Sequence, residues 1–188
     1  FFFKQKTAYE IPKRDWSSDV CSSDLTDHRY HVLSTEGGHM DYAALDGIED
    51  AILKRLRKTF TRVSAERIVS GPGIVAIYET LAEMEGRAHL HKDDKAIWTE
   101  ALEGTDSIAL AALDRFCLAL GAVAGDLALA HGAKGVVIAG GLGLRIKDKL
   151  LRSGFDQRFV AKGRFQSMMA KLPRSEEHTS ELQSRFGI

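Results

Sequence analysis

The sequence predicts an α/β fold. Its carboxyl-side half carries a long apolar segment of helical character from Thr105 to His131, followed by a continuous apolar strand over Gly135 to Ala139. A glycine-rich turn ends the strand, and a second helix is expected from Leu144 to Leu151. Helix, buried strand, glycine turn and helix in this order are typical of a domain in which helices cover a sheet.

The amino-side half is predicted to begin with a short strand and an amphipathic helix. HVLST, from His31 to Thr35, has the residues of a strand and leads into two glycines. From about Asp46 to Phe60, apolar residues recur at helical spacing on one face, and charged residues that include Glu49 occupy the other. We expect this helix to pack through its apolar face and to show its charges to water.

Two more helices are expected on either side of a forced break. Ser64 suits the N-cap of a short helix that runs through Val69. The sequence SGPG at 70–73 then interrupts the chain, because proline lacks an amide hydrogen and glycine permits unusual φ values. A second helix resumes at Ile74, and residues 85–94 are expected to form an exposed loop.

The segment from Thr105 to His131 is apolar around most of its circumference, so its helix belongs in the centre of the domain. Gly121 and Gly125 lie four residues apart and leave a bare stripe, where another element can approach closely. Gly132 is the expected stop of this helix. A final helical stretch is expected around residues 163–165.

Composition and charge argue against several classes of protein. The 188 residues include 26 basic and 26 acidic side chains, so the formal net charge is zero. This balance offers no attraction to nucleic acid, and the apolar runs are judged too interrupted by charge to span a membrane. Two cysteines, Cys21 and Cys117, are too few for a disulfide framework, which favours a reducing, cytoplasmic location.

Both ends of the chain read unlike its middle. RSEEHTSELQS, which begins at Arg174, back-translates codon for codon into a sequencing-library adapter. KQKTAYEI and DWSSDVCSSDL near the start give adapter sequence in the same way. We therefore expect residues 1–25 to be adapter-derived and disordered, residues 174–188 to be an adapter-derived tail, and residues 26–173 to be an internal slice of a longer gene.

Three clusters can carry chemistry. Two glycines between Glu36 and His39 let the backbone turn sharply, so a carboxylate and an imidazole can converge on a ligand that bears hydroxyls. Glu66 opens the helix after Ser64, where a helix dipole equally favours a carboxylate. Gly140 and Gly141 follow the buried strand, at the edge where ligands of α/β sheets bind. Each cluster also has a purely structural interpretation as a cap or a turn.

Taken in order, four motifs resemble one family, the bacterial glucokinases of the hexokinase and actin-like superfamily. They are STEGGHMDYA at 34–43, VSAERIVSGPGIVAIY at 63–78, GDLALAHGAKGVVIAGGLGLR at 125–145 and SGFDQRFVAKGRF at 153–165. The resemblance implies an actin-like, ribonuclease H-like fold, of which this chain is part of the larger carboxyl-side domain. It also implies ATP-dependent phosphorylation of glucose to glucose 6-phosphate, the first step of glycolysis, with Mg²⁺, in a protein that is a homodimer when intact.

The resemblance carries over residue by residue. It makes Glu36, His39 and Glu66 ligands of glucose, and it places Gly140 and Gly141 beside the adenosine of ATP. Residues 121–128 resemble the interdomain connector, in which small residues permit hinge closure. The family's phosphate loops and its Asn-Asp catalytic pair are not found in this sequence, so no catalytic or metal-binding residue is assigned and the chain alone is expected to be inactive.

Other interpretations stay open at this point. Another sugar kinase or a sugar-binding regulator of the same superfamily is possible, although the regulators usually follow the Glu-x-x-His loop with a cysteine-rich zinc motif that does not follow His39. A metal-dependent hydrolase would use Glu36, His39 and Asp41, or His89 and His91, but these spacings match no helix-borne zinc signature. A module that binds a partner through apolar helix faces is the third alternative.

Overall fold

The computed structural model describes residues 20–26, 29–87 and 92–176, and within these ranges the chain is mostly helical, with two two-stranded sheets. The elements in chain order are β1 (Val20–Thr26), β2 (Arg29–Thr35), η1 (Gly37–His39), α1 (Gly47–Leu56), α2 (Ala65–Ile68), α3 (Gly73–Met84), α4 (Asp94–Glu103), α5 (Ser107–Ala130), β3 (Val136–Ile138), α6 (Gly141–Leu150), α7 (Phe155–Val160), η2 (Gly163–Phe165), α8 (Gln166–Met169) and β4 (Arg174–Glu176).

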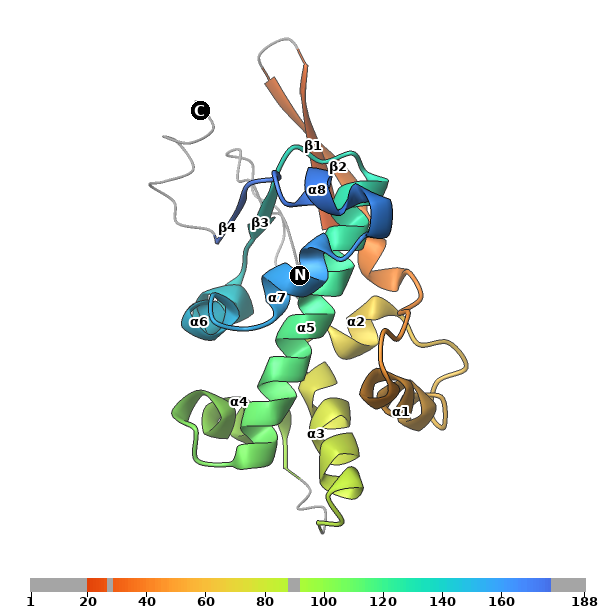
Figure 1. Cartoon of the computed structure of the whole chain (residues 1–188), viewed down its shortest axis with the longest axis vertical. Coiled ribbons are helices and arrows are strands. Elements are labelled where there is room, and N and C mark those ends of the chain that lie inside the picture. Colours follow the sequence, from red (N-terminus) through yellow and green to blue (C-terminus); the bar gives the residue numbers. More distant parts are fainter. Residues whose placement is uncertain (1–19, 27–28, 88–91, 177–188) are drawn as a thin grey trace.

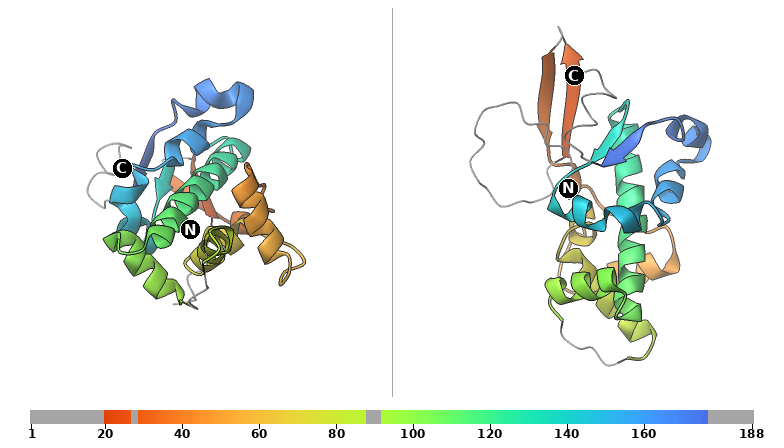
Figure 2. Two further views of the ribbon diagram at one scale, coloured as in Figure 1. Left: turned by 60° about the horizontal axis from the view of Figure 1, so that its bottom comes forward. Right: turned by 90° about the vertical axis from the view of Figure 1, so that its left-hand side faces the viewer.

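Helix α5 is the central element, as its apolar sequence predicts. Figure 1 shows α1, α2 and α3 on one side of α5, and α4 and α6 on the other. Figure 2 shows the same helix running through the molecule when it is viewed from two further directions. The other helices therefore cover α5 from several sides.

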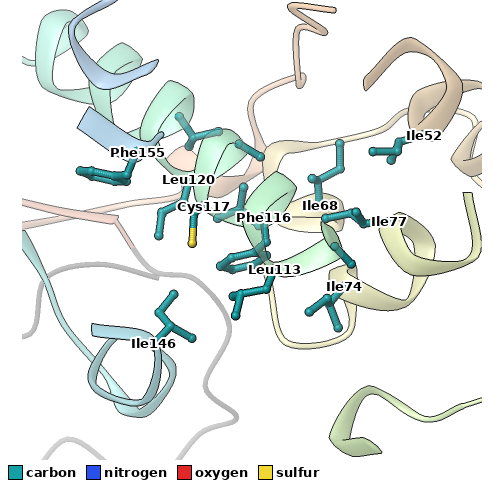
Figure 3. Close-up of a cluster of buried hydrophobic side chains, with 14 of the residues drawn as sticks. Ile52, Ile68, Ile74, Ile77, Leu113, Phe116, Cys117, Leu120, Ile146 and Phe155 are labelled. Carbon is teal, nitrogen blue, oxygen red and sulfur yellow. The ribbon is translucent and has the colours of Figure 1, made fainter. Parts of the chain in front are cut away.

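The core is built on the side chains of α5. Leu113, Phe116 and Leu120 are fully buried, and Figure 3 shows them among isoleucines of α2 and α3 on one side and Ile146 of α6 on the other. The Trp98 ring of α4 meets Phe116 edge to face, with ring centroids 5.0 Å apart. Cys117 is also buried, and burial raises its thiol pKa to about 12, so it acts as a small apolar residue.

Helix α5 is long and apolar enough to cross a membrane by length and composition alone. The sequence argument that no apolar run qualifies was therefore wrong. In the structure, 72% of its most apolar stretch is buried inside the protein. The apolarity of α5 is that of a core helix, because other helices pack against the faces that lipid would contact around a membrane-spanning helix.

The glycine stripe is used as predicted, and the element that approaches it is α7. A Cβ atom on Gly121 would lie 2.3 Å from the Phe155 carbonyl oxygen, and one on Gly125 would lie 2.4 Å from the Phe159 carbonyl oxygen. The buried Lys162 side chain closes the same contact, because its Nζ donates to the Ala122 carbonyl oxygen at 2.9 Å. The backbones of α5 and α7 meet where only glycine fits.

Helix α4 lies where the sequence analysis predicts no helix. The expected loop at residues 85–94 gives way to a helix that begins at Asp94, capped by the Asp93 carboxylate, which accepts from the Ala96 amide at 2.8 Å. The helix ends at Gly104, whose φ is +71°. Aspartate and glycine at these two positions were the missed signals of a helix start and stop.

The strand expected at residues 135–139 is β3, and in the described part of the chain it pairs in parallel with β4, with Val136 opposite Arg174. The helices between them make this pair an α/β crossover, although the described residues are mostly helical. The predicted strand at 31–35 is the end of β2, which pairs with β1 in antiparallel register from Val20↔Thr35 to Thr26↔Arg29.

The structure departs from the expectation of disorder near the start of the chain, and it also adds a short strand in the expected tail. Residues 20–25 were expected to be disordered, yet they belong to β1, and residues 174–176 of the expected tail form β4. Backbone pairing accounts for both, because strand hydrogen bonds need no particular side chain. The adapter origin of the ends stays a prediction.

A charged cluster ties α3, α4 and α5 together. The Asp106 carboxylate caps α5 by accepting from the Ile108 and Ala109 amides, and it also accepts from Lys92 Nζ at 2.8 Å and from the Tyr78 hydroxyl at 3.0 Å. Burial by itself raises the pKa of Asp106, but these four donors outweigh it and lower the pKa to about 2.

We predict that Asp106→Asn lowers the stability at pH 7 by about 2 kcal/mol. Because the folded pKa lies below the unfolded one, the carboxylate stabilises the fold above pH 4, and its contribution disappears as the pH falls towards 2. Urea unfolding between pH 2 and pH 7 checks this. Asp114→Asn, at an exposed position of α5, is the control. Curves for the wild type and Asp106→Asn that stay equally far apart at every pH would contradict it.

We also predict that Gly121→Ala destabilises the fold by about 3 kcal/mol, because the new methyl group meets backbone that cannot rotate away. Gly47→Ala is the matched control in α1, where a Cβ would meet nothing within 4 Å. Thermal unfolding followed by circular dichroism measures both. Equal midpoints for the two variants would show that α5 and α7 do not pack this closely.

Candidate functional site

The first predicted site segment forms a single turn of 3₁₀ helix directly after β2. Glu36 precedes this turn, and the His39 amide donates to the Glu36 carbonyl oxygen at 2.9 Å. Gly38 in the middle of the turn is buried. The turn brings the side chains of Glu36 and His39 to the same surface, with the His39 imidazole 4.0 Å from the Glu36 carboxylate.

The second segment is held beside the first by backbone pairing. The Tyr42 amide donates to the Val63 carbonyl oxygen at 3.1 Å, and the Ala65 amide donates to the Met40 carbonyl oxygen at 2.8 Å. These two bonds fix the start of α2 against the 3₁₀ turn. Glu66, in the first turn of α2, is thereby brought to the loop that carries His39.

Glu36, His39 and Glu66 form one cluster, as the sequence predicts. Nδ1 of His39 lies 3.2 Å from Oε2 of Glu66. The side chains of His39 and Glu36 are 65% and 73% exposed, whereas that of Glu66 is 24% exposed. Carboxylates accept and an imidazole both accepts and donates, so the cluster is suited to a ligand with several adjacent hydroxyls.

A second charged cluster, which the sequence analysis missed, lies where the chain after Tyr42 leads into α1. Asp46 caps α1, and its Oδ2 accepts from Arg115 of α5 and from Arg158 of α7, each at 2.6 Å. Arg158 also lies 3.2 Å from Oε1 of Glu49. Although burial opposes it, the amide and arginine donors lower the pKa of the Asp46 carboxyl. The cluster connects α1, α5 and α7.

Glu49 corrects an expectation, because it was predicted to face water and is only 3% exposed. Its Oε2 accepts from the Leu45 amide at 2.7 Å, and its other oxygen faces Arg158. Burial and the neighbouring Glu49 raise the pKa of Tyr42, whose ring is buried three residues after His39. The local sequence does not show that Glu49 is buried, because its partner Arg158 comes from a distant helix, α7.

Gly140 and Gly141 form the turn between β3 and α6, as expected. The φ of Gly140 is +94°, in the region that favours glycine, and a Cβ on either residue would meet nothing within 4 Å. The space beside the turn is open, so a ligand can approach its backbone closely. This turn is separate from the Glu36 cluster, since α6 and α2 lie on opposite sides of α5 in Figure 1.

The geometry does not support the hydrolase alternative. In the described ranges, no group of three or more His, Cys, Asp and Glu side chains is placed so that it could hold a metal ion, and Asp41 is paired with Arg62. His89 and His91 lie outside the described residues.

Comparison with known proteins identifies the family to which this chain belongs. A family model described as glucokinase matches residues 20–175. A glucokinase of Zymomonas mobilis is 62% identical over 148 residues, which are 79% of this chain and 46% of that protein. A glucokinase of Stenotrophomonas maltophilia is 43% identical over 77% of this chain and 43% of its own length. The chain belongs to the glucokinase family.

Solved structures show the same fold. A glucokinase from an Antarctic psychrotroph aligns with a TM-score of 0.74 and 34% identity, over 90% of this chain and 56% of that one. A glucokinase of Balamuthia mandrillaris, solved in complex with glucose, aligns with a TM-score of 0.66 at 16% identity over 79% of this chain and 44% of that one, a likeness of fold alone. The chain spans about half the length of the relatives it matches.

Proposed function

We propose that this chain is the carboxyl-side part of a glucokinase that transfers a phosphoryl group from ATP to D-glucose and forms glucose 6-phosphate. The observation that carries the proposal is the contact of His39 with Glu66 at 3.2 Å, with Glu36 beside them. These residues come from the two motifs that bind glucose in the family. Membership of the glucokinase family supports the carry-over.

In this proposal the three side chains hold the sugar by its hydroxyls. Glu36 and Glu66 accept hydrogen bonds, and the His39 ring, oriented by the Glu66 carboxylate, provides a further contact. A site that pairs each hydroxyl rejects an analogue that leaves one polar group unmatched, by as much as about 10⁴-fold. The cluster therefore supplies specificity, and none of its residues is assigned as the base for the hydroxyl that is phosphorylated.

The proposal assigns the nucleotide to the turn at Gly140 and Gly141. The open space beside both glycines fits a flat adenosine lying against the backbone. When bound, ATP supplies the phosphoryl group, and Mg²⁺ neutralises charge on its phosphates. No side chain of the described ranges is assigned to Mg²⁺, because no group of three or more His, Cys, Asp and Glu side chains there is placed so that it could hold a metal ion.

The finer architecture belongs to the same proposal. We assign the chain to the larger carboxyl-side domain of an actin-like, ribonuclease H-like fold, with α5 as the connector about which the domains close. The small residues of α5 from Gly121 to Ala128 support this role, because they let α7 lie against its backbone. The complete enzyme is proposed to act as a homodimer in the cytoplasm, in keeping with a buried, unpaired Cys117.

Glu66→Gln is predicted to weaken glucose binding about ten-fold, because the amide is uncharged and accepts through one oxygen instead of two. Glucose titration of the 188-residue chain, followed by nuclear magnetic resonance of the His39 ring, measures the affinity. Glu103→Gln, at an exposed position in α4, is the control. Equal affinities of Glu66→Gln and the wild type, or equal binding of galactose and glucose, would contradict the assignment.

The 188-residue chain alone is predicted to form no glucose 6-phosphate above a blank. The sequence contains neither the family's Asn-Asp catalytic pair nor its phosphate loops, and phosphoryl transfer depends on positioning and charge stabilisation from such groups. A coupled assay with the Zymomonas mobilis glucokinase as positive control tests this. Sugar-dependent turnover by the chain would refute it.

A further inference from the structure

Glu49 binds more of the chain than helix capping requires. It is the third residue of α1, where a glutamate commonly reaches back to the amide of the capping residue, which is Asp46 in this helix. Its Oε2 instead accepts from the amide of Leu45, one residue before the cap, at 2.7 Å. Glu49 is also only 3% exposed, whereas glutamates are mostly left in water. The buried carboxylate therefore holds the chain that leads into α1.

Arg158 of α7 fixes the direction of this carboxylate. Its Nη2 lies 3.2 Å from Oε1 of Glu49 and donates to Oδ2 of Asp46 at 2.6 Å. Replacing a buried ion pair by apolar side chains often costs no stability, so such a pair is weak evidence for a stabilising role. It does require its two partners in one relative position, because contacts between charged hydrogen-bonding groups are directional. The pair is therefore suited to positioning the segment before α1.

The segment that Glu49 holds comes from the turn that carries His39. Residues 42–45 connect this turn to α1 and form no helix or strand. At the end near α1, the amide of Leu45 donates to Glu49. At the other end, Tyr42 is buried, and its burial and the neighbouring Glu49 charge raise its pKa. The Tyr42 amide forms one of the two backbone bonds that hold the turn beside α2. One carboxylate thus lies beside both ends of the connection.

The contact between His39 and Glu66 is weak by itself. Nδ1 of His39 lies 3.2 Å from Oε2 of Glu66, and the His39 side chain is 65% exposed. The two residues belong to a single 3₁₀ turn and to a helix of only four residues. An exposed pair of this kind contributes little free energy of its own, so its geometry depends on what holds the backbone on either side.

We propose that Glu49 is a positioning residue for the glucose site, which keeps the turn of Glu36 and His39 at Glu66 by fixing residues 42–45. The inference rests on the proposed function in one respect, the binding of glucose at this turn. The position of the turn relative to Glu66 does not depend on that assignment. In this role Glu49 acts through the turn and has no contact with the sugar.

The test compares Glu49→Gln with Asp50→Asn in the 188-residue chain. Glutamine keeps the size of the side chain and removes the charge that meets Arg158. The control removes the same charge from an exposed position one residue further along α1. Nuclear Overhauser contacts between the His39 ring and the Glu66 side chain report the position of the turn, and calorimetry reports the affinity for glucose. Glu49→Gln is expected to lose the ring contacts and to bind glucose about five-fold more weakly, and Asp50→Asn to match the wild type.

Thermal unfolding separates positioning from a loss of the fold, and both readouts are taken below the midpoint of each variant. If Glu49→Gln does not fold, Arg158→Lys takes its place, because lysine keeps the charge but lacks the planar guanidinium that meets Glu49. It is expected to weaken the same ring contacts. A lower midpoint, with ring contacts and glucose affinity equal to those of the wild type, shows a purely structural role and overturns the proposal for either variant.

The outcomes distinguish this inference from the proposed function. No glucose binding by the wild type, together with ring contacts that Glu49→Gln abolishes, overturns the proposed function and supports the positioning of the turn. Ring contacts that persist in the folded variant, or that are absent from the wild type, overturn the positioning role and leave the glucose assignment to its own test. Ring contacts that are lost while glucose affinity stays unchanged also overturn it, because the site then does not need the position that Glu49 maintains.

Discussion

The burial of α5 is the constraint on which the rest of the structure depends. Fifteen of its residues are buried, and the other helices lie around it. An apolar helix of this length is stable in water only while other elements cover it. The close approach of α7 at Gly121 and Gly125 removes the space that larger residues would need. Helix α5 is therefore held by side-chain packing on most of its faces and by direct contact with the backbone of α7 on one.

Helix α5 also helps to hold the segment that follows the Glu36–His39 turn. Arg115 of α5 and Arg158 of α7 reach the same oxygen of Asp46, which caps α1. Glu49 and Arg158 pair with each other near Tyr42, which follows the turn that carries His39. Removing one partner of such a buried pair leaves an uncompensated charge, which costs far more than an exposed pair contributes. The cluster of Glu36, His39 and Glu66 is thus followed along the chain by a second charged cluster, to which α5 contributes Arg115 and α7 contributes Arg158.

Much of this could be predicted from sequence, and the failures have a common cause. The long helix, its glycine stripe, the break at SGPG and the turn at Gly140 follow from local periodicity and backbone chemistry, and all are present. Glu49 was assigned to the wrong environment, because its partner Arg158 comes from a helix far away in the chain. The contact of His39 with Glu66 was expected only through family resemblance, since local pattern does not show which loops pair. How deeply α5 is buried likewise depends on the helices that pack around it. The local sequence does not show those helices, and the length and apolarity of α5 were underestimated.

The positions of the two candidate sites give α5 a mechanical meaning in the proposed enzyme. The cluster of Glu36, His39 and Glu66 and the turn before α6 lie on opposite sides of this helix, so the helix between them sets their separation. A phosphoryl donor and its acceptor must be aligned closely for transfer, and small misplacements are costly. Because α5 is packed so tightly, a displacement on one side of this helix is transmitted to the other side and is not absorbed. The glycines of α5 therefore do more than admit α7, because in the proposed enzyme the dense contact that they permit lets a single helix keep the two candidate sites in register.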